Sequence, residues 1–404
     1  MKYITLVRTV RHSQYSETMP ANQYAVIGAG VFGAWIAYSL RRGGHDVLLV
    51  DQYGPANSRA SSGGESRIIR AAYGPDEVYT RMAARSLELW PELFARTGAD
   101  LLHRIGVLWL LRPNDPRLEQ SRAALHKVGI HFEDLSAEDL RRRYPQMRLE
   151  PDTIALLEPH SGALMARQAV ATVVEQFVRD GGSYRHAAVE PLGERAGKLE
   201  SIQTLDGSSI AAGAYVFACG PWLGKVLPAV VGGRIFPTRQ EVLFFGLQPG
   251  DRRFEAPQMP IWLDYADARG MYGFPDLERR GFKLACDVHG PAFDPDSGDR
   301  VVSAETIEAA LSYLKERFPA LANAPLVDSR VCQYENTSNG DLILDRHPDL
   351  ENVWIAGGGS GHGFKHGPAV GEYMAARVTG AAAPAVEPRF LLASKGTQKN
   401  RSIY

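Results

Sequence analysis

The sequence predicts a doubly wound α/β domain into which a second domain, built on a mixed or antiparallel sheet, is inserted. Residues 24–27 are an apolar run followed directly by a glycine-rich turn, and residues 353–356 repeat that arrangement near the end of the chain. A buried strand that turns into a helix in this way is the unit of a parallel α/β sheet. Alternating strands replace this pattern between 234 and 329, and 404 residues exceed what one hydrophobic core usually fills.

The first α/β unit is complete near the N-terminus. After the strand Tyr24-Ala25-Val26-Ile27, the chain turns through Gly28-Ala29-Gly30-Val31-Phe32-Gly33 into a helix that runs to Arg42. Gly43-Gly44 ends this helix because glycine adopts the left-handed cap without strain. Residues 47–51 form the next strand, which completes a β-α-β unit.

Further elements follow from helical spacing, capping residues and apolar runs. We expect helices at 77–96, from the cap Ser136 with Asp139 three residues on, through 170–174, near 304–316 and at about 368–378, and strands at 106–111, 215–219 and 240–244. The alternation of strands and helices that is typical of an α/β sheet therefore resumes twice after interruptions.

This alternation predicts a discontinuous layout. Residues 1–21 are expected to form a disordered leader, and residues 386–404 a polar, frayed C-terminal tail. The dinucleotide-binding domain is expected to comprise 22–100, 160–233 and 330–385, and the substrate domain 101–159 and 234–329. Such a double insertion is uncommon for a plain nicotinamide dehydrogenase.

The spacing Gly28-x-Gly30-x-x-Gly33, with Asp51 at the end of the next strand, predicts a dinucleotide-binding turn. Gly28 permits the tight turn, Gly30 lets the backbone approach a pyrophosphate, and Gly33 lets helix and strand pack closely. The helix N-terminus faces the phosphates, and Asp51 accepts from a ribose hydroxyl. This turn alone does not separate FAD from NAD.

Composition excludes several classes of function. A formal net charge of −1 gives no basic field for nucleic acid, and no apolar run approaches the ~20 residues that span a bilayer. Three cysteines are too few for a disulfide framework and suit a reducing compartment, so the cytoplasm is the expected location. The sequence contains no HExxH, paired CxxC or P-loop motif, so metal and phosphoryl-transfer chemistry have no support.

Four blocks of sequence carry a resemblance to a known family. They are the glycine turn at 28–33; Ser61-Ser62-Gly63-Gly64-Glu65-Ser66-Arg67-Ile68-Ile69-Arg70-Ala71-Ala72-Tyr73-Gly74; Tyr272-Gly273-Phe274-Pro275 with Gly281-Phe282-Lys283-Leu284; and Cys332-Gln333-Tyr334 through Asp345-Arg346-His347-Pro348 to Gly359-Ser360-Gly361-His362-Gly363-Phe364-Lys365. In this order and spacing, over about residues 24–380, the chain resembles the monomeric sarcosine oxidase branch of the D-amino acid oxidase-like flavoproteins, which also holds N-methyltryptophan and pipecolate oxidases.

The resemblance implies that the α/β part is a Rossmann-like, FAD-binding domain. Cys332 matches the position at which family members carry a thioether to the 8α-methyl group of the flavin, whereas a cysteine by itself is most often a buried small hydrophobe. The implied cofactor-binding residues are Gly28, Gly30, Val31, Phe32, Gly33, Asp51, Ser62, Arg67, Gly220, Trp222, Cys332, Gly361, Gly363, Phe364 and Lys365.

Two cations are candidates for holding a substrate carboxylate. Guanidinium and ammonium groups suit a carboxylate, and a lysine at the end of a glycine-rich loop is costly to bury unless it meets an anion. Taken alone, Arg70 and its neighbour Arg67 could be two surface arginines, and Lys365 a surface lysine. The resemblance implies that Arg70 and Lys365 clamp the carboxylate and that Arg67 lies over the flavin ring.

Three further residues are expected near the reacting groups. By resemblance, Lys283 stands over the flavin and promotes the reaction with oxygen, since a fixed cation stabilises the charge that forms on it; a lone lysine in a strand otherwise faces water. Tyr272 is expected to donate to the substrate, or else to be a packed strand aromatic. Asp287 stands where relatives with the smallest substrates tend to have histidine, which puts sarcosine itself in doubt.

The resemblance therefore implies a flavin oxidase of a small secondary amino acid, N-alkyl or cyclic. A hydride passes from the carbon next to nitrogen to flavin N5, the imine hydrolyses, and dioxygen leaves as hydrogen peroxide. A flavin dehydrogenase that passes electrons to a quinone or a protein, and a non-catalytic FAD-binding subunit, are the alternatives. We expect a monomer whose partners are the small amino acid and dioxygen, with neither nucleic acid nor membrane.

Overall fold

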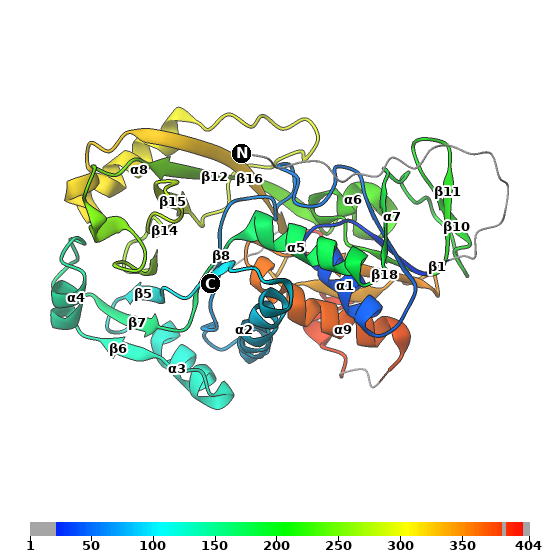
Figure 1. Ribbon diagram of the computed structural model, residues 1–404, viewed down its shortest axis with the longest axis horizontal. Coiled ribbons are helices and arrows are strands. Elements are labelled where there is room, and N and C mark those ends of the chain that lie inside the picture. Colours follow the sequence, from blue (N-terminus) through cyan, green and yellow to red (C-terminus); the bar gives the residue numbers. More distant parts are fainter. Residues whose placement is uncertain (1–21, 382–384, 399–404) are drawn as a thin grey trace.

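The computed structural model describes residues 22–381 and 385–398, and it confirms the predicted fold class (Figure 1). The predicted leader at 1–21 lies outside the described residues. The first sheet has the strand order β17-β18-β11-β1-β2-β9, with β10 paired to β11. Its strands are β1 (Asn22–Ile27), β2 (Val47–Asp51), β9 (Ser183–His186), β10 (Ser201–Gln203), β11 (Ser209–Phe217), β17 (Ile343–Arg346) and β18 (Val353–Gly357). Because β1 pairs in parallel with both β11 and β2, its glycine turn lies at the centre of the sheet's carboxyl edge.

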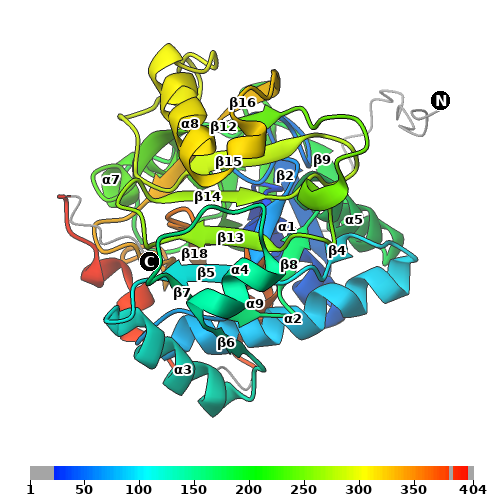
Figure 2. The same ribbon diagram turned by 90° about the vertical axis from the view of Figure 1, so that its left-hand side faces the viewer.

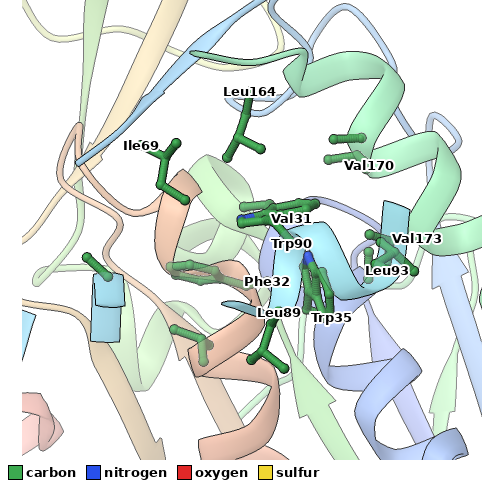
Figure 3. Packing of buried hydrophobic residues seen from close by; sticks show 14 of the residues in the cluster. Val31, Phe32, Trp35, Ile69, Leu89, Trp90, Leu93, Leu164, Val170 and Val173 are labelled. Carbon is green, nitrogen blue, oxygen red and sulfur yellow. The ribbon is translucent and has the colours of Figure 1, made fainter. Parts of the chain in front are cut away.

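Apolar side chains of the central strands alternate between two cores, so helices cover both faces. Tyr24 and Val26 point to one core and Ala25 and Ile27 to the other. The first core, drawn in Figure 3, packs Trp35 against Trp90 with ring centroids 5.0 Å apart. The first face carries α1 (Val31–Arg42), α2 (Glu77–Thr97), α5 (Ala166–Arg179) and α9 (Gly367–Thr379), and the second face carries α6 (Leu223–Val226) and α7 (Pro228–Val231).

The second sheet is mixed and has the order β16-β12-β15-β14-β13-β5-β7-β6. Only β13 and β5 run parallel among its neighbouring pairs, and Figure 2 shows several of its strands side by side. The strands are β5 (Val107–Leu111), β6 (Glu133–Leu135), β7 (Ile154–Glu158), β12 (Phe236–Phe245), β13 (Ile261–Asp264), β14 (Met271–Phe274), β15 (Phe282–Cys286) and β16 (Leu326–Asn336). A third core buries one face of this sheet under α4 (Ala137–Arg143) and α8 (Ala304–Arg317). The opposite face is therefore turned toward the first domain.

A small sheet connects the two large ones. It consists of β3 (Arg67–Ile69), β8 (Gly162–Leu164) and β4 (Leu102–His103), with β8 in the middle. β3 lies against the short helix η4 (Phe364–His366), which follows the second glycine loop. This contact brings the segment after β3 next to η4, although the two are almost 300 residues apart in the sequence.

The remaining helices are short or lie outside the main helical layers of the cores. They are α3 (Pro116–Val128), η1 (Gly220–Trp222), η2 (Arg252–Phe254), η3 (Pro319–Leu321), η5 (Pro388–Phe390) and η6 (Leu392–Ser394). Among them, η1 borders the carboxyl edge of the first sheet. Across residues 22–381 and 385–398, none of the helices combines the length and the apolar character needed to cross a bilayer.

The end of the chain differs from the prediction of a frayed tail. Phe390 and Leu392 are buried, and the Lys395 ammonium donates to Asn339 Oδ1 at 3.1 Å. The prediction is therefore wrong for 388–396, because two apolar residues in this polar segment are enough to dock it. We also propose that the domain boundary expected at 330 lies after Asn336, since β16 pairs with β12 over its full length.

Candidate active site

A cavity lies at the carboxyl edge of the first sheet, between the turn after β1 and the glycine loop after β18. We call it the glycine-loop cavity. Two of the predicted cofactor residues, Gly33 and Lys365, lie outside its lining. The predicted residues that line it are Gly28, Gly30, Val31, Phe32, Asp51, Ser62, Arg67, Gly220, Trp222, Cys332, Gly361, Gly363 and Phe364.

The three glycines of the first turn are needed for different reasons. Gly28 has φ +106°, and an added Cβ would collide with the carbonyl of Ala218. A Cβ at Gly33 would collide with the carbonyl of Gly28, so this residue serves packing of helix on strand. Gly30 has an ordinary φ of −68°, and its Cβ would meet only the Ser62 hydroxyl at 3.5 Å. Since neither conformation nor packing demands glycine there, a group bound in the cavity explains it.

Asp51 closes the other side of the same turn. Its Oδ2 accepts from the backbone N–H of Ala29 at 2.7 Å, and its Oδ1 from that of Tyr53 at 2.8 Å. Burial raises the pKa of Asp51, and these backbone N–H groups lower it in part. Asp51 lines the cavity with a group that only accepts hydrogen bonds, as binding of a ribose hydroxyl requires. The glycine turn and Asp51 together fit the adenosine diphosphate part of FAD.

A second cavity continues from the first one toward the second sheet. Arg67, Cys332, Tyr334, Gly361 and Phe364 line both cavities, so the two spaces adjoin. We call the second the cationic cavity. Its lining brings together the predicted substrate and oxygen residues, from the second sheet, from the segment after β3 of the small sheet and from η4: Arg70, Tyr272, Lys283, Asp287 and Lys365.

Arg70 is buried and lies between two aromatic rings. Its guanidinium carbon is 4.4 Å from the ring centroid of Tyr73 and 4.4 Å from that of Trp109. One of its nitrogens donates to the carbonyl of Ala72. Arg70 is 5 % exposed, which rules out the surface position that a lone arginine would suggest.

Lys365 and Arg70 both contact Tyr73. The Lys365 ammonium donates to the Tyr73 hydroxyl at 2.8 Å and to the carbonyl of His362 at 2.8 Å. Burial, reinforced by the positive charge of Arg70, lowers the pKa of Lys365 well below its usual range. An anion bound between these two groups would compensate both effects, so this wall of the cavity is suited to a carboxylate.

Lys283 faces the cationic cavity because of its place in β15. Its neighbours Phe282 and Leu284 point to the core under α8, so the lysine points the other way. Its ammonium donates to the carbonyl and the hydroxyl of Ser66 at 3.0 and 3.1 Å. Burial, with Arg67 as the next cause, lowers the pKa of Lys283 well below its usual range. The lysine does not face water.

Cys332 lies where the two cavities meet. Its Sγ is 3.4 Å from a guanidinium nitrogen of Arg67, which also donates to the carbonyl of Ser61 at 2.5 Å. The residue is buried and unpaired. Its sulfur therefore lies on the wall of both cavities, next to a guanidinium.

A chain of polar groups also lines the cationic cavity. The Tyr334 hydroxyl donates to Asp287 Oδ1 at 3.0 Å and also interacts with the hydroxyl of Tyr272. Burial, followed by the negative charge of Asp287, raises the pKa of Tyr272. Asp287 follows the last residue of β15, so it and His289 lie in a loop and not on the strand.

Sequence reasoning assigned no role to Tyr73, although this residue joins the two cations. Its hydroxyl contacts His366 Nε2 at 2.8 Å and His362 Nδ1 at 3.2 Å as well as Lys365. Tyr73 belongs to the second block of sequence that carried the family resemblance. Nothing in its local pattern separates it from a core aromatic, because its partners come from η4 and from the glycine loop before it.

Glu335 was also missed. It lines the glycine-loop cavity on β16, and its Oε1 has no hydrogen-bond partner among the described residues. Burial raises the pKa of Glu335 from 4.5 to about 7, despite hydrogen bonds from the backbone of Gly358 and Gly359. A buried carboxyl of this kind is protonated in part at neutral pH.

Glu335 should make the protein less stable at alkaline pH. A carboxyl whose pKa is higher in the folded state favours folding below its unfolded pKa, and the advantage is lost as pH rises through about 7. The shift corresponds to about 3 kcal/mol between pH 4.5 and pH 8. Urea unfolding of the wild type and of Glu335→Gln at both pH values measures it. The variant should lack this loss, and an equal pH dependence in both proteins would contradict the assignment.

Comparison with known proteins agrees with the site. Residues 23–377 match the family model described as FAD dependent oxidoreductase (DAO). The chain is 32% identical to peroxisomal sarcosine oxidase of Mus musculus over 86% of this chain and 90% of that one, and 31% identical to monomeric sarcosine oxidase of Bacillus sp. (strain NS-129) over 88% and 92%. It shares its fold with L-proline dehydrogenase from P. horikoshii, with a TM-score of 0.81, 21% identity and coverage of 92% and 97%. The chain belongs to the DAO family of FAD-dependent oxidoreductases.

Proposed function

We propose that this protein is an FAD-dependent amine oxidase that acts on a small secondary amino acid, N-alkyl or cyclic, with dioxygen as the acceptor. The observation that carries the proposal is the cationic cavity, which adjoins the glycine-loop cavity and holds two buried cations, Arg70 and Lys365, around one tyrosine. A buried pair of like charges is costly unless an anion lies between them. The carboxylate of an amino acid supplies that anion beside the redox cofactor.

In this proposal the chain positions the substrate and FAD supplies the redox chemistry. Arg70 and Lys365 hold the carboxylate, and the polar chain from Tyr272 through Tyr334 to Asp287 forms another part of the wall, where the amino group and its substituent lie. FAD bound in the glycine-loop cavity would supply the redox chemistry: it would take a hydride from the carbon next to nitrogen and pass the two electrons to dioxygen, and the imine product would hydrolyse in water. Lys283 provides a fixed positive charge for the negative charge that develops on dioxygen.

Oxidase and dehydrogenase activity are separated by the fate of the electrons. Secondary amino acids added to the holoenzyme without oxygen should bleach the flavin absorbance. In air, the same substrates should then yield one hydrogen peroxide per oxidised amine. Bleaching without peroxide would assign a dehydrogenase, and the absence of bleaching with every amino acid would favour a non-catalytic FAD-binding subunit.

We propose further that FAD is bound covalently through Cys332. The sulfur lies at the junction of the cavities and next to the Arg67 guanidinium. In the bond the sulfur would replace one hydrogen of the flavin 8α-methyl group, the flavin ring would take up the two protons and two electrons released, and dioxygen would reoxidise it. Acid denaturation of the wild type should therefore leave a yellow chain, whereas Cys332→Ser should release its flavin. Cys219→Ser is the matched control and should keep the flavin attached. Release of free FAD from the wild type would exclude the bond.

The protein is proposed to act as a monomer on a small amino acid. The named relative from Bacillus sp. is a monomeric sarcosine oxidase, and the site is assembled within one chain. Asp287 is expected to determine substrate preference, because it places a carboxylate on the wall that receives the amino group.

A further inference from the structure

Two of the three contacts that hold Arg70 lead back to one buried carboxylate; the third is the Tyr73 ring. Arg70 donates to the carbonyl of Ala72 and lies over the ring of Trp109. Ala72 and Trp109 are each held by a residue from outside their own strand or turn. Each donates a hydrogen bond to Glu158, the last residue of β7, which is 0 % exposed.

Glu158 uses both of its oxygens for this purpose. Oε1 accepts from Trp109 Nε1 at 3.0 Å and from the backbone N–H of Ala72 at 3.1 Å. Oε2 accepts from the backbone N–H of Ala71 at 2.7 Å and from the Ser161 hydroxyl at 2.8 Å. None of the four donors is a cation. The carboxylate therefore organises the segment after β3 instead of neutralising a neighbouring charge.

We propose that Glu158 is a positioning residue: it fixes the guanidinium of Arg70 and so sets the affinity of the cationic cavity for carboxylates. The inference rests on the proposed function, in which Arg70 holds the substrate carboxylate. Glu158 does not line the cavity and acts through Arg70. It also connects the two domains, because it lies on the second sheet while Arg70 follows β3 of the small sheet.

A carboxylate is the side chain that these surroundings require. Four donors point at two oxygens, and only a group with two acceptor oxygens can satisfy all of them. Glutamine would turn an NH2 group toward two donors and displace the segment or the indole. The charge of Glu158 also acts on the other half of the clamp. Burial and Arg70 lower the pKa of Lys365, and Asp287 and Glu158 oppose them.

A double-mutant cycle tests the proposal in the holoenzyme. Acetate is the probe, and its Kd follows from the change in the flavin spectrum. Glu158→Gln should weaken acetate binding by about tenfold, but by less than about twofold when Arg70 is already methionine, because coupled residues do not act additively. Equal weakening in both backgrounds would overturn the proposal, since Glu158 would then act independently of Arg70.

Two further variants separate positioning from general damage. Asp264→Asn removes another buried carboxylate, on β13, which Arg317 and Tyr313 hold outside the cavity lining. It should lower stability and leave the Kd of acetate unchanged. Ser161→Ala deletes only the side-chain donor to Glu158 Oε2 and leaves the Trp109 ring over Arg70 unchanged, so it replaces Glu158→Gln in the cycle should that variant fail to fold. If Arg70→Met alone leaves acetate affinity unchanged, the proposed clamp fails, which is a different outcome from loss of coupling.

Discussion

Arg70→Met is expected to lower kcat/KM for a small secondary amino acid by about a thousandfold, or ~4 kcal/mol, the effect of removing one member of a buried charged contact. Arg70 is buried, and its guanidinium is held between two aromatic rings. The loss should appear mainly in KM and in the Kd of acetate, because the carboxylate is held in the ground state as well as in the transition state. Steady-state kinetics and anaerobic rapid mixing measure it.

Arg70→Lys is the matched control for charge. It keeps a cation but loses the planar fork that lies between the rings of Tyr73 and Trp109. We expect it to recover only part of the activity. A loss of less than tenfold in Arg70→Met would mean that the carboxylate is held elsewhere, and the proposed role of the cationic cavity would be wrong.

Lys283→Met is expected to slow the reaction of the reduced enzyme with dioxygen by about a hundredfold to a thousandfold, the usual effect of removing one preorganised electrostatic contact. Anaerobic flavin reduction by the substrate should change much less, because the carboxylate clamp is intact. Lys283 has its pKa lowered by burial, so the ammonium form gains most when negative charge develops beside it. Stopped-flow mixing of the reduced enzyme with oxygenated buffer measures this step separately.

Two outcomes bear on the oxygen site. Lys283→Arg should retain a large part of the rate if a positive charge is what matters. Should Lys283→Met slow flavin reduction as strongly as reoxidation, the lysine would serve the substrate and not dioxygen. The proposed division of the cavity into a clamp and an oxygen site would then be wrong.

Residues whose environment is fixed by local pattern could be predicted from the sequence. The glycine turn followed the rule for a strand that becomes a helix, and Asp51 fell at its expected place at the end of β2. Alternation in β15 determines which way Lys283 points, although the sequence could not say which face was buried. The site residues that lie far from the glycine turn in the sequence were predicted from the resemblance to a known family.

Residues held by partners far away in the chain could not be predicted in this way. Glu158 reads as one acid in an apolar strand, and only the fold brings it to Ala71, Ala72 and Trp109. The docked C-terminal segment was missed for the same reason, because Phe390 finds its core only in the folded protein. Local sequence carries no signal for such contacts.

The central claim is that one carboxylate binds between Arg70 and Lys365 next to FAD. A crystal structure of the holoenzyme with a carboxylate that cannot be oxidised, such as 2-furoate, tests it most directly. We expect the carboxylate oxygens within hydrogen-bonding distance of the Arg70 guanidinium and the Lys365 ammonium, with the furan ring over the flavin. A ligand bound away from both cations, or a nicotinamide in the cavity, would contradict the account.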